Sequence, residues 1–223
     1  MEANQNGYAP STGIKEALDA IEGDANKKGI DNILDIFVTS GASEAIEICL
    51  SALLNEGDNF LMPTPGYPLY TAVQSKLMLQ ANPYYLDEEN GWQPDIEDIK
   101  AKVNEKTKAI VVVHIGGWPA EIIKISKLAK KYNLFLIEDC AQAHGAGLNI
   151  KNKFYSVGQF GDISTWSFCQ DKIISTGGEG GMVSTNNEEF YKKIWSFKDH
   201  GKSLSKISDK SQSLSYKFIH DKL

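Results

Sequence analysis

Arginine is absent from this 223-residue chain, in which all 23 basic residues are lysines. Arginine is the side chain that most often holds carboxylates and phosphates through two parallel hydrogen bonds. The chain therefore lacks the usual clamp for an acidic ligand.

Cysteines and long apolar runs are also scarce. The three cysteines, Cys49, Cys140 and Cys169, lie far apart and lack the paired spacing of a zinc site or a disulfide framework, so we expect them to be reduced and structural. No apolar run is long enough to span a membrane, and the first residues lack the basic and apolar parts of a signal peptide. The net charge of -6 argues against a nucleic-acid surface. We expect a soluble, cytoplasmic protein with neither a nucleic-acid nor a membrane partner.

The length and the hydrophobic content of 42% predict one large domain with a sizeable core, over residues 1–201. Residues 202–223 are rich in serine and lysine and poor in apolar side chains. This composition is typical of a linker or a partly ordered tail.

Strand-like and helix-like segments alternate along the large domain. Expected strands cover residues 35–39, 59–62, 83–86, 108–114, 134–139, 162–168 and 181–185, and expected helices cover 43–54, about 68–77, 94–103, 119–132 and 188–198. This alternation predicts a three-layer α/β fold with a mostly parallel, seven-stranded sheet. Ligands of such sheets bind at the carboxyl ends of the strands, where Gly41, Tyr67, His114 and Asp139 are expected to lie.

Lys172 and Asp139 form the most informative pair of residues. Lys172 lies between an expected strand and the glycine-rich segment Gly177–Gly181, and Asp139 ends another strand. Pyridoxal 5'-phosphate (PLP) needs an amine that condenses with its aldehyde and a carboxylate that keeps its ring nitrogen protonated. Lys172 can supply the amine and Asp139 the carboxylate.

Two parts of the chain resemble different branches of the fold type I PLP-dependent aminotransferases. Residues 112–203 resemble the DegT/DnrJ/EryC1/StrS sugar aminotransferases, through segments 113–120, 137–145, 161–163, 168–172 and 177–182. Residues 4–111 resemble the class I, alanine aminotransferase-like enzymes, through segments 6–13, 38–46 and 63–70. The large domain is therefore predicted to be a mosaic with a junction near 108–114, and the small C-terminal domain of both families is expected to be missing.

The resemblance of residues 112–203 implies four roles toward the cofactor. Lys172 would form the Schiff base and shuttle a proton, and Asp139 would pair with the pyridine nitrogen. Gln142 would lie near the ring and its phenolic oxygen, and Ser167 would bind the phosphate. Taken singly, Asp139 is also typical of a helix cap or a turn residue, Ser167 of a plain strand residue, and Lys172 of a solvated surface group.

The resemblance of residues 4–111 implies the rest of the cofactor site. Gly41, Ala42 and Ser43 would form a phosphate cup at the start of a helix. Tyr67 would stack on the cofactor ring. The alternatives are that Ser43 is an ordinary helix cap and that Tyr67 anchors a turn in the core.

Three functions remain open from the sequence. The first is a PLP-dependent aminotransferase that moves an amino group from an amino acid to a keto sugar, and the second is a class I amino-acid aminotransferase. The second is disfavoured because the chain has no arginine and because His114–Pro119 replaces the Asn-Pro-Thr-Gly type motif of class I enzymes. The third is a truncated mosaic that binds PLP without turnover.

Two other kinds of site are not expected. The histidines do not have ligand spacing, so no metal site is predicted. Segment Gly177–Gly181 lacks the strand-turn-helix context of a dinucleotide-binding loop. The resemblance further implies a homodimer, since fold type I sites usually form at a dimer interface.

Overall fold

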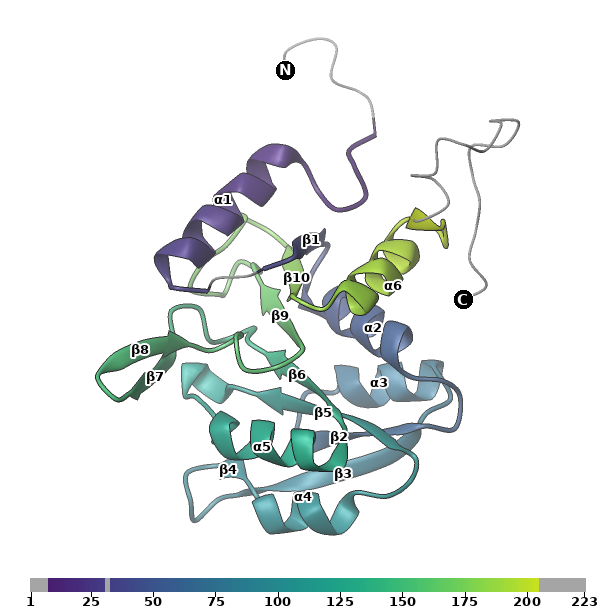
Figure 1. The fold of residues 1–223 in the computed structure, drawn as a ribbon, viewed down its shortest axis with the longest axis vertical. Helices are drawn as coiled ribbons and strands as arrows, with labels where there is room; N and C mark the ends of the chain where they lie inside the picture. The colour runs from purple at the N-terminus through teal and green to yellow at the C-terminus, as the bar shows by residue number, and fades with distance from the viewer. Residues whose placement is uncertain (1–7, 31–32, 205–223) are drawn as a thin grey trace.

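The computed structural model describes residues 8–30 and 33–204 (Figure 1). Its centre is an eight-stranded sheet in the order β1-β10-β9-β6-β5-β2-β3-β4. The strands are β1 Asp35–Thr39, β2 Asn59–Thr64, β3 Gln80–Asp87, β4 Gln93–Pro94, β5 Thr107–Val113, β6 Phe135–Asp139, β9 Ile163–Ser167 and β10 Gly181–Thr185. All seven expected strands are present, and β4 is an added two-residue edge strand too short to show a pattern in the sequence.

The pairings divide the sheet into two parts. Strands β9, β6, β5, β2 and β3 are parallel to their neighbours in this series. Strand β10 runs antiparallel to both β9 and β1, and β4 runs antiparallel to β3. The expected α/β fold is confirmed, with the ends of the parallel strands gathered along one edge.

Helices cover both faces of the sheet (Figure 1). They are α1 Lys15–Lys27, α2 Ala42–Leu53, α3 Leu69–Lys76, α4 Ile96–Lys102, α5 Ile122–Tyr132 and α6 Glu188–Lys198. One core cluster joins α2, α3 and α6 to Ala109 and Val111 of β5, and the other joins α4 and α5 to Ile110 and Val112. Alternate residues of β5 thus enter opposite layers, which explains why this strand is almost wholly apolar.

Two features were not expected from the sequence. Helix α1 buries only Ala25 and carries Gly23 in its interior, so its apolar pattern is weak. The hairpin of β7 Gly147–Ile150 and β8 Lys153–Ser156 turns through Lys151 and Asn152, both in the left-handed region. A turn without an Asn-Gly or Asp-Gly pair gives little signal.

Two further observations bear on the sequence predictions. No helix in residues 8–30 and 33–204 is long and apolar enough to cross a membrane. The expected tail at 202–223 lies outside the described residues from residue 205 onward.

Candidate active site

A cavity of about 730 Å³ lies at the carboxyl ends of the strands. Segments that follow β1, β2, β5, β6 and β9 line it. All eight residues predicted to act on the cofactor are among its lining residues: Gly41, Ala42, Ser43, Tyr67, Asp139, Gln142, Ser167 and Lys172. The fold therefore brings the two halves of the predicted site together, while the role of each residue remains a prediction.

The Asp139 carboxylate is buried at the end of β6. Asp139 is 8% exposed; its Oδ1 accepts a hydrogen bond from the Ala141 amide at 2.9 Å, and its Oδ2 accepts one from the Tyr70 hydroxyl. Burial raises the pKa of Asp139, and the bonds from Tyr70 and Ala141 partly oppose that rise. Asp139 ends β6 and leads into a turn toward β7, so the helix-cap interpretation is wrong, whereas the bond from the Ala141 amide is consistent with a turn residue.

The raised pKa of Asp139 predicts a pH dependence of stability. The folded protein binds the carboxyl proton of Asp139 more tightly than the unfolded chain does. The stability that this proton contributes is complete below the ordinary pKa of 3.8 and is lost as the pH rises through the pKa of the folded state. We expect urea unfolding of cofactor-free protein to show wild type losing stability relative to Asp139→Asn as the pH rises from 4 to 7. A difference that stays constant over this range would contradict the prediction.

Lys172 lies across the cavity on the loop after β9. Its side chain is 20% exposed, and its Nζ lies 2.9 Å from the Asp171 carboxylate. The positive charge of Lys172 lowers the pKa of Asp139, although by less than burial raises it. A lysine that is mostly buried and lines a cavity does not fit the interpretation as a solvated surface group.

Gln142 and Ser167 each keep a hydrogen-bond donor available. Gln142 Oε1 accepts from the Gly116 amide at 2.7 Å, and its Nε2 has no partner within the described parts of the chain. Ser167 is 5% exposed, and its Oγ accepts from the Cys169 amide at 3.3 Å. The Gln142 amide and the Ser167 hydroxyl can therefore donate to an anionic ligand oxygen.

The start of α2 supplies free backbone donors. The helix begins at Ala42 after Gly41, and no side chain caps it. The Glu44 carboxylate instead accepts from the amide and hydroxyl of Ser40, at 2.6 and 2.8 Å. The interpretation of Ser43 as the helix cap is wrong, and the first amides remain open to an anion.

Tyr67 lies at the mouth of the cavity. It is 64% exposed, so the interpretation as a core tyrosine is wrong. Its ring has an open face that can cover a flat ligand.

Gly181 allows β10 to pass directly behind the start of α2. A Cβ atom at Gly181 would lie 2.4 Å from the carbonyl carbon of Gly41 and 2.6 Å from the amide nitrogen of Ala42. Contacts this short require the backbone to move. The position of the start of α2, where the phosphate cup is predicted, thus depends on the absence of a side chain at Gly181 in β10.

We expect Gly181→Ala to displace the start of α2 and to weaken PLP binding at least tenfold, with a loss of about 1–3 kcal/mol in stability from overpacking. Gly178→Ala is the matched control, since a Cβ there meets nothing within 4 Å and its φ is not positive. PLP titration and urea unfolding of both variants check this. Equal PLP affinity in the two variants would refute it.

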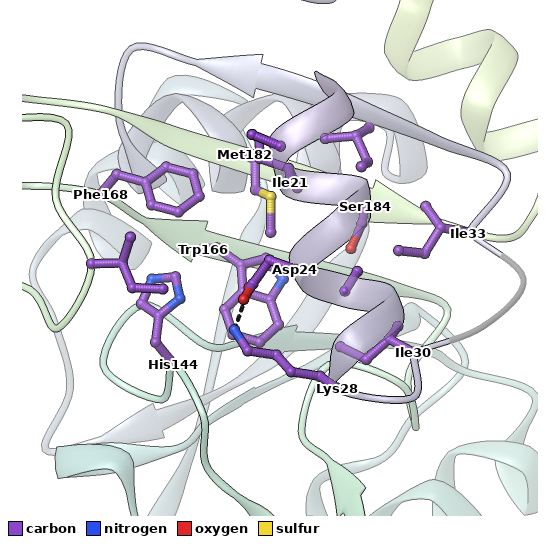
Figure 2. Close-up of a pocket in the computed structure, with 14 residues that line it drawn as sticks. Ile21, Asp24, Lys28, Ile30, Ile33, His144, Trp166, Phe168, Met182 and Ser184 are labelled. Atoms are coloured by element: carbon purple, nitrogen blue, oxygen red, sulfur yellow. Dashed lines mark hydrogen bonds and ion pairs between the residues drawn. The ribbon is translucent and has the colours of Figure 1, made fainter. Parts of the chain in front are cut away.

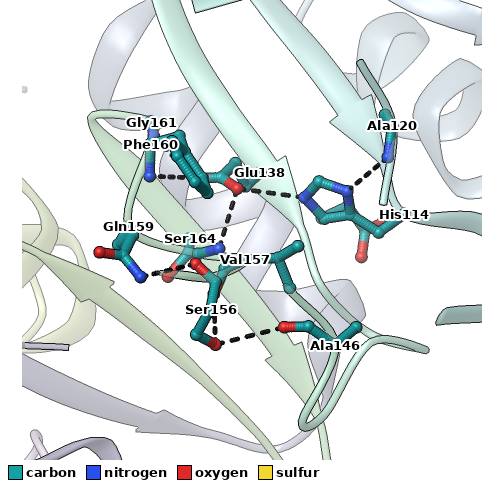
Figure 3. A network of polar contacts seen from close by, with 12 residues as sticks. His114, Ala120, Glu138, Ala146, Ser156, Val157, Gln159, Phe160, Gly161 and Ser164 are labelled. Carbon is teal, nitrogen blue, oxygen red and sulfur yellow. Dashed lines mark hydrogen bonds and ion pairs between the residues drawn. The ribbon is translucent and has the colours of Figure 1, made fainter. Parts of the chain in front are cut away.

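Sequence reasoning missed a buried network behind Asp139 (Figure 3). The Glu138 carboxylate is fully buried and accepts from the amides of Gly158, Phe160 and Gly161 at 2.6–2.8 Å. His114 Nε2 lies 3.1 Å from the same carboxylate, and its Nδ1 accepts from the Ala120 amide. The Nδ1 bond places the ring proton on Nε2, which donates to Glu138.

The network also bears on metal binding. His114, Glu138 and Cys140 place ligand atoms within 4.8 Å of one another. Both ring nitrogens and both carboxylate oxygens are already hydrogen-bonded. The cluster is therefore explained as a structural brace, and the signal for it in the sequence was the charged Glu138 inside an apolar strand.

Tyr70 and Glu179 were missed as well. Tyr70 is 1% exposed and follows Tyr67 by about one helical turn, which placed it in the core pattern of α3. Glu179 lines the cavity and accepts a hydrogen bond from the Cys169 thiol at 3.1 Å. It belongs to the glycine-rich segment that the sequence explained only as a turn.

The lining of the cavity fits PLP in charge and shape. It offers a buried carboxylate, an amine, a free amide donor, a hydroxyl, a helix start and an exposed aromatic ring. The carboxylate suits a pyridine nitrogen, the amine an aldehyde and the amide donor a phenolic oxygen. The hydroxyl and the helix start suit a phosphate, and the aromatic ring suits a flat ring.

Comparisons with known proteins agree with this chemistry. A 34% identical aminotransferase structure from Psychrobacter cryohalolentis matches with a TM-score of 0.78 and covers 96% of this chain and 51% of that one. The chain is 41% identical over 194 residues to GDP-perosamine synthase of Escherichia coli O157:H7, across 86% of this chain and 51% of that protein. It is also 39% identical over 141 residues to glutamate-pyruvate aminotransferase AlaA of Haemophilus influenzae, across 60% of this chain and 35% of that protein.

The chain thus spans about half the length of the curated relatives it matches. A family model matches residues 34–218, which begins well before the expected junction near 108–114. By the match over these residues, the chain belongs to the DegT/DnrJ/EryC1/StrS aminotransferase family.

Proposed function

We propose that this chain forms the cofactor-binding part of a PLP-dependent aminotransferase that moves an amino group from an amino acid to a keto sugar. The observation that carries the proposal is the meeting of Lys172, Asp139 and the open start of α2 around one cavity. The relationship to GDP-perosamine synthase favours a sugar acceptor.

Bound PLP would supply an aldehyde that takes up amines and a protonated ring that withdraws electrons. Asp139, oriented by Tyr70 and Ala141, would hold the proton on the ring nitrogen. Lys172 would hold the cofactor through its Nζ, and the same amine would carry a proton to and from the substrate carbon.

Other groups would orient the cofactor and keep water away. The first amides of α2 and the hydroxyls of Ser43 and Ser167 would hold the phosphate. The Gln142 Nε2 would donate to the phenolic oxygen, and the Tyr67 ring would cover one face of the pyridine.

We further propose that the chain acts as a homodimer. The cavity exposes Tyr67 and Ile115, which are 64 and 42% accessible, and Trp118, which is 72% accessible, lines an adjoining pocket that shares Ile115. Large apolar side chains grouped around an open site suit a surface that a second subunit covers. Light scattering that gives a strict monomer would count against this proposal.

A half-reaction with L-glutamate tests the aminotransferase activity. Protein loaded with PLP should release 2-oxoglutarate and leave the cofactor in its pyridoxamine form. Bound PLP without 2-oxoglutarate would instead support a remnant that binds the cofactor without turnover. A parallel assay with L-alanine tests the alternative amino-acid aminotransferase, which the relationship to AlaA favours.

A further inference from the structure

A second cavity, of about 290 Å³, lies between α1 and the sheet face formed by β9 and β10 (Figure 2). Its walls are mostly apolar and include Ile21, Ile33, Trp166, Phe168 and Met182. An engineered apolar cavity of about 150 Å³ is known to bind benzene, so this space is large enough for a substituted ring. It does not share a lining residue with the cavity around Lys172.

His144 is the polar group that distinguishes this cavity (Figure 2). It is 7% exposed, and its ring packs against Trp166 and Phe168 at centroid distances of 5.1 and 5.3 Å. Its Nε2 lies 2.7 Å from the Ser167 carbonyl oxygen. A carbonyl only accepts, so Nε2 carries the proton and Nδ1 presents a lone pair.

The Nδ1 lone pair is available to a ligand. It has no hydrogen-bond partner in residues 8–30 and 33–204. Among the same residues, Ser196 Oγ is the fully enclosed side-chain polar atom without a partner. His144 Nδ1 also has no partner and is therefore not fully enclosed, and the space next to its ring is this cavity. Burial lowers the pKa of His144, which keeps the ring neutral and Nδ1 unprotonated.

The other polar groups of the cavity are already paired. Lys28 and Asp24 form an ion pair with each other on α1 (Figure 2). Ser184 shares a hydrogen bond with Ser164 at 2.7 Å. Apart from this ion pair, the His144 Nδ1 is an acceptor that lies among aromatic and aliphatic walls.

We propose that this cavity binds a small aromatic molecule that carries one O–H or N–H donor, with the donor on His144 Nδ1 and the ring among Trp166, Phe168 and Met182. An apolar ring removes the wall atoms from water, and its donor bonds to the Nδ1 lone pair of His144. The site goes beyond the proposed aminotransferase function and does not depend on it.

The ligand would also touch the loop that carries Lys172. Phe168 and Ile174, on either side of Lys172 in the chain, line this cavity. The Phe168 amide donates to the Gly180 carbonyl at 2.7 Å, and the Phe168 carbonyl accepts from the Thr176 amide at 3.1 Å. A bound ring should therefore slow hydrogen exchange at these two amides.

The test compares 4-methylphenol with toluene, which has the same ring and methyl group but no donor. Both are titrated into the cofactor-free chain and followed by NMR, so neither PLP nor turnover enters the result. We expect 4-methylphenol to bind about threefold to tenfold more tightly, as one neutral hydrogen bond provides. Equal affinity for the two ligands, or no binding of either at millimolar concentration, would overturn the proposal.

Two variants localise the effect. In His144→Phe the preference for 4-methylphenol should disappear while toluene still binds. Ala20→Phe places a ring at the exposed rim of the cavity and should weaken both ligands at least tenfold without disturbing the core. If His144→Phe does not fold, Ala20→Phe decides alone, because unchanged affinity in it would place the ligands elsewhere and refute the site.

Discussion

Lys172→Ala is expected to abolish covalent attachment of PLP to the chain. The Lys172 side chain lines the same cavity as Asp139 and is 20% exposed. The measurement is borohydride reduction of the PLP-treated protein, followed by peptide mass mapping. Wild type should carry the label at Lys172 with near-unit stoichiometry, and the variant should carry none at the site.

The large number of lysines makes a matched control necessary. With 23 lysines, the chain offers many amines that can react slowly with an aldehyde. Lys130→Ala removes an exposed amine on α5 and should leave labelling at wild-type level. Lys172→Ala should still bind PLP without a covalent bond, because Asp139 and the start of α2 remain in place. Wild-type labelling of Lys172→Ala would refute the assignment.

Glu138→Gln is expected to lower the free energy of unfolding by about 3–5 kcal/mol, because two hydrogen bonds to a charged carboxylate would be lost at about 1.5–3 kcal/mol each. In glutamine, an NH₂ group would replace one of the two carboxylate oxygens. It would face either the Gly158 amide and His114 or the amides of Phe160 and Gly161, and these N–H donors would lose their acceptor. Of a total stability of roughly 5–15 kcal/mol, this is a large fraction. Urea unfolding of the cofactor-free protein measures it.

An exposed acid provides the control for this variant. Glu97 is 82% exposed in its pair with Lys100, and Glu97→Gln should change stability by less than about 0.5 kcal/mol. If Glu138→Gln yields no folded protein, His114→Leu removes one donor from Glu138 and should cost about 1.5–3 kcal/mol. A loss under 1 kcal/mol in Glu138→Gln would show that the network does not brace the fold.

Much of the fold could be predicted because the central strands are strongly apolar. The strand at 107–113 alternates between two buried layers, and such a run has few other stable arrangements. Helix α1 gave no comparable pattern, because it buries one residue fully and leaves most of its surface exposed. Its packing against β1 comes from tertiary contacts rather than from helix propensity.

The candidate site was predictable where motif and topology coincide. Asp139 and Gly41 end strands or follow them, and strand ends of a parallel sheet meet at one edge. Tyr70 was not predictable as the partner of Asp139, since 69 residues separate them and the tyrosine fits a core pattern equally well. The cap interpretation of Ser43 failed because Glu44 bonds to Ser40 instead.

The sequence by itself determined the order of strands and helices, the absence of arginine and the identity of the reactive lysine and aspartate candidates. These are local properties, set by side-chain chemistry and by the spacing of apolar residues. The tertiary structure alone decided which polar groups lose water and which partners they gain. Asp139 with Tyr70, Glu138 with His114, and His144 with an open Nδ1 all depend on burial and long-range contacts, which no local pattern encodes.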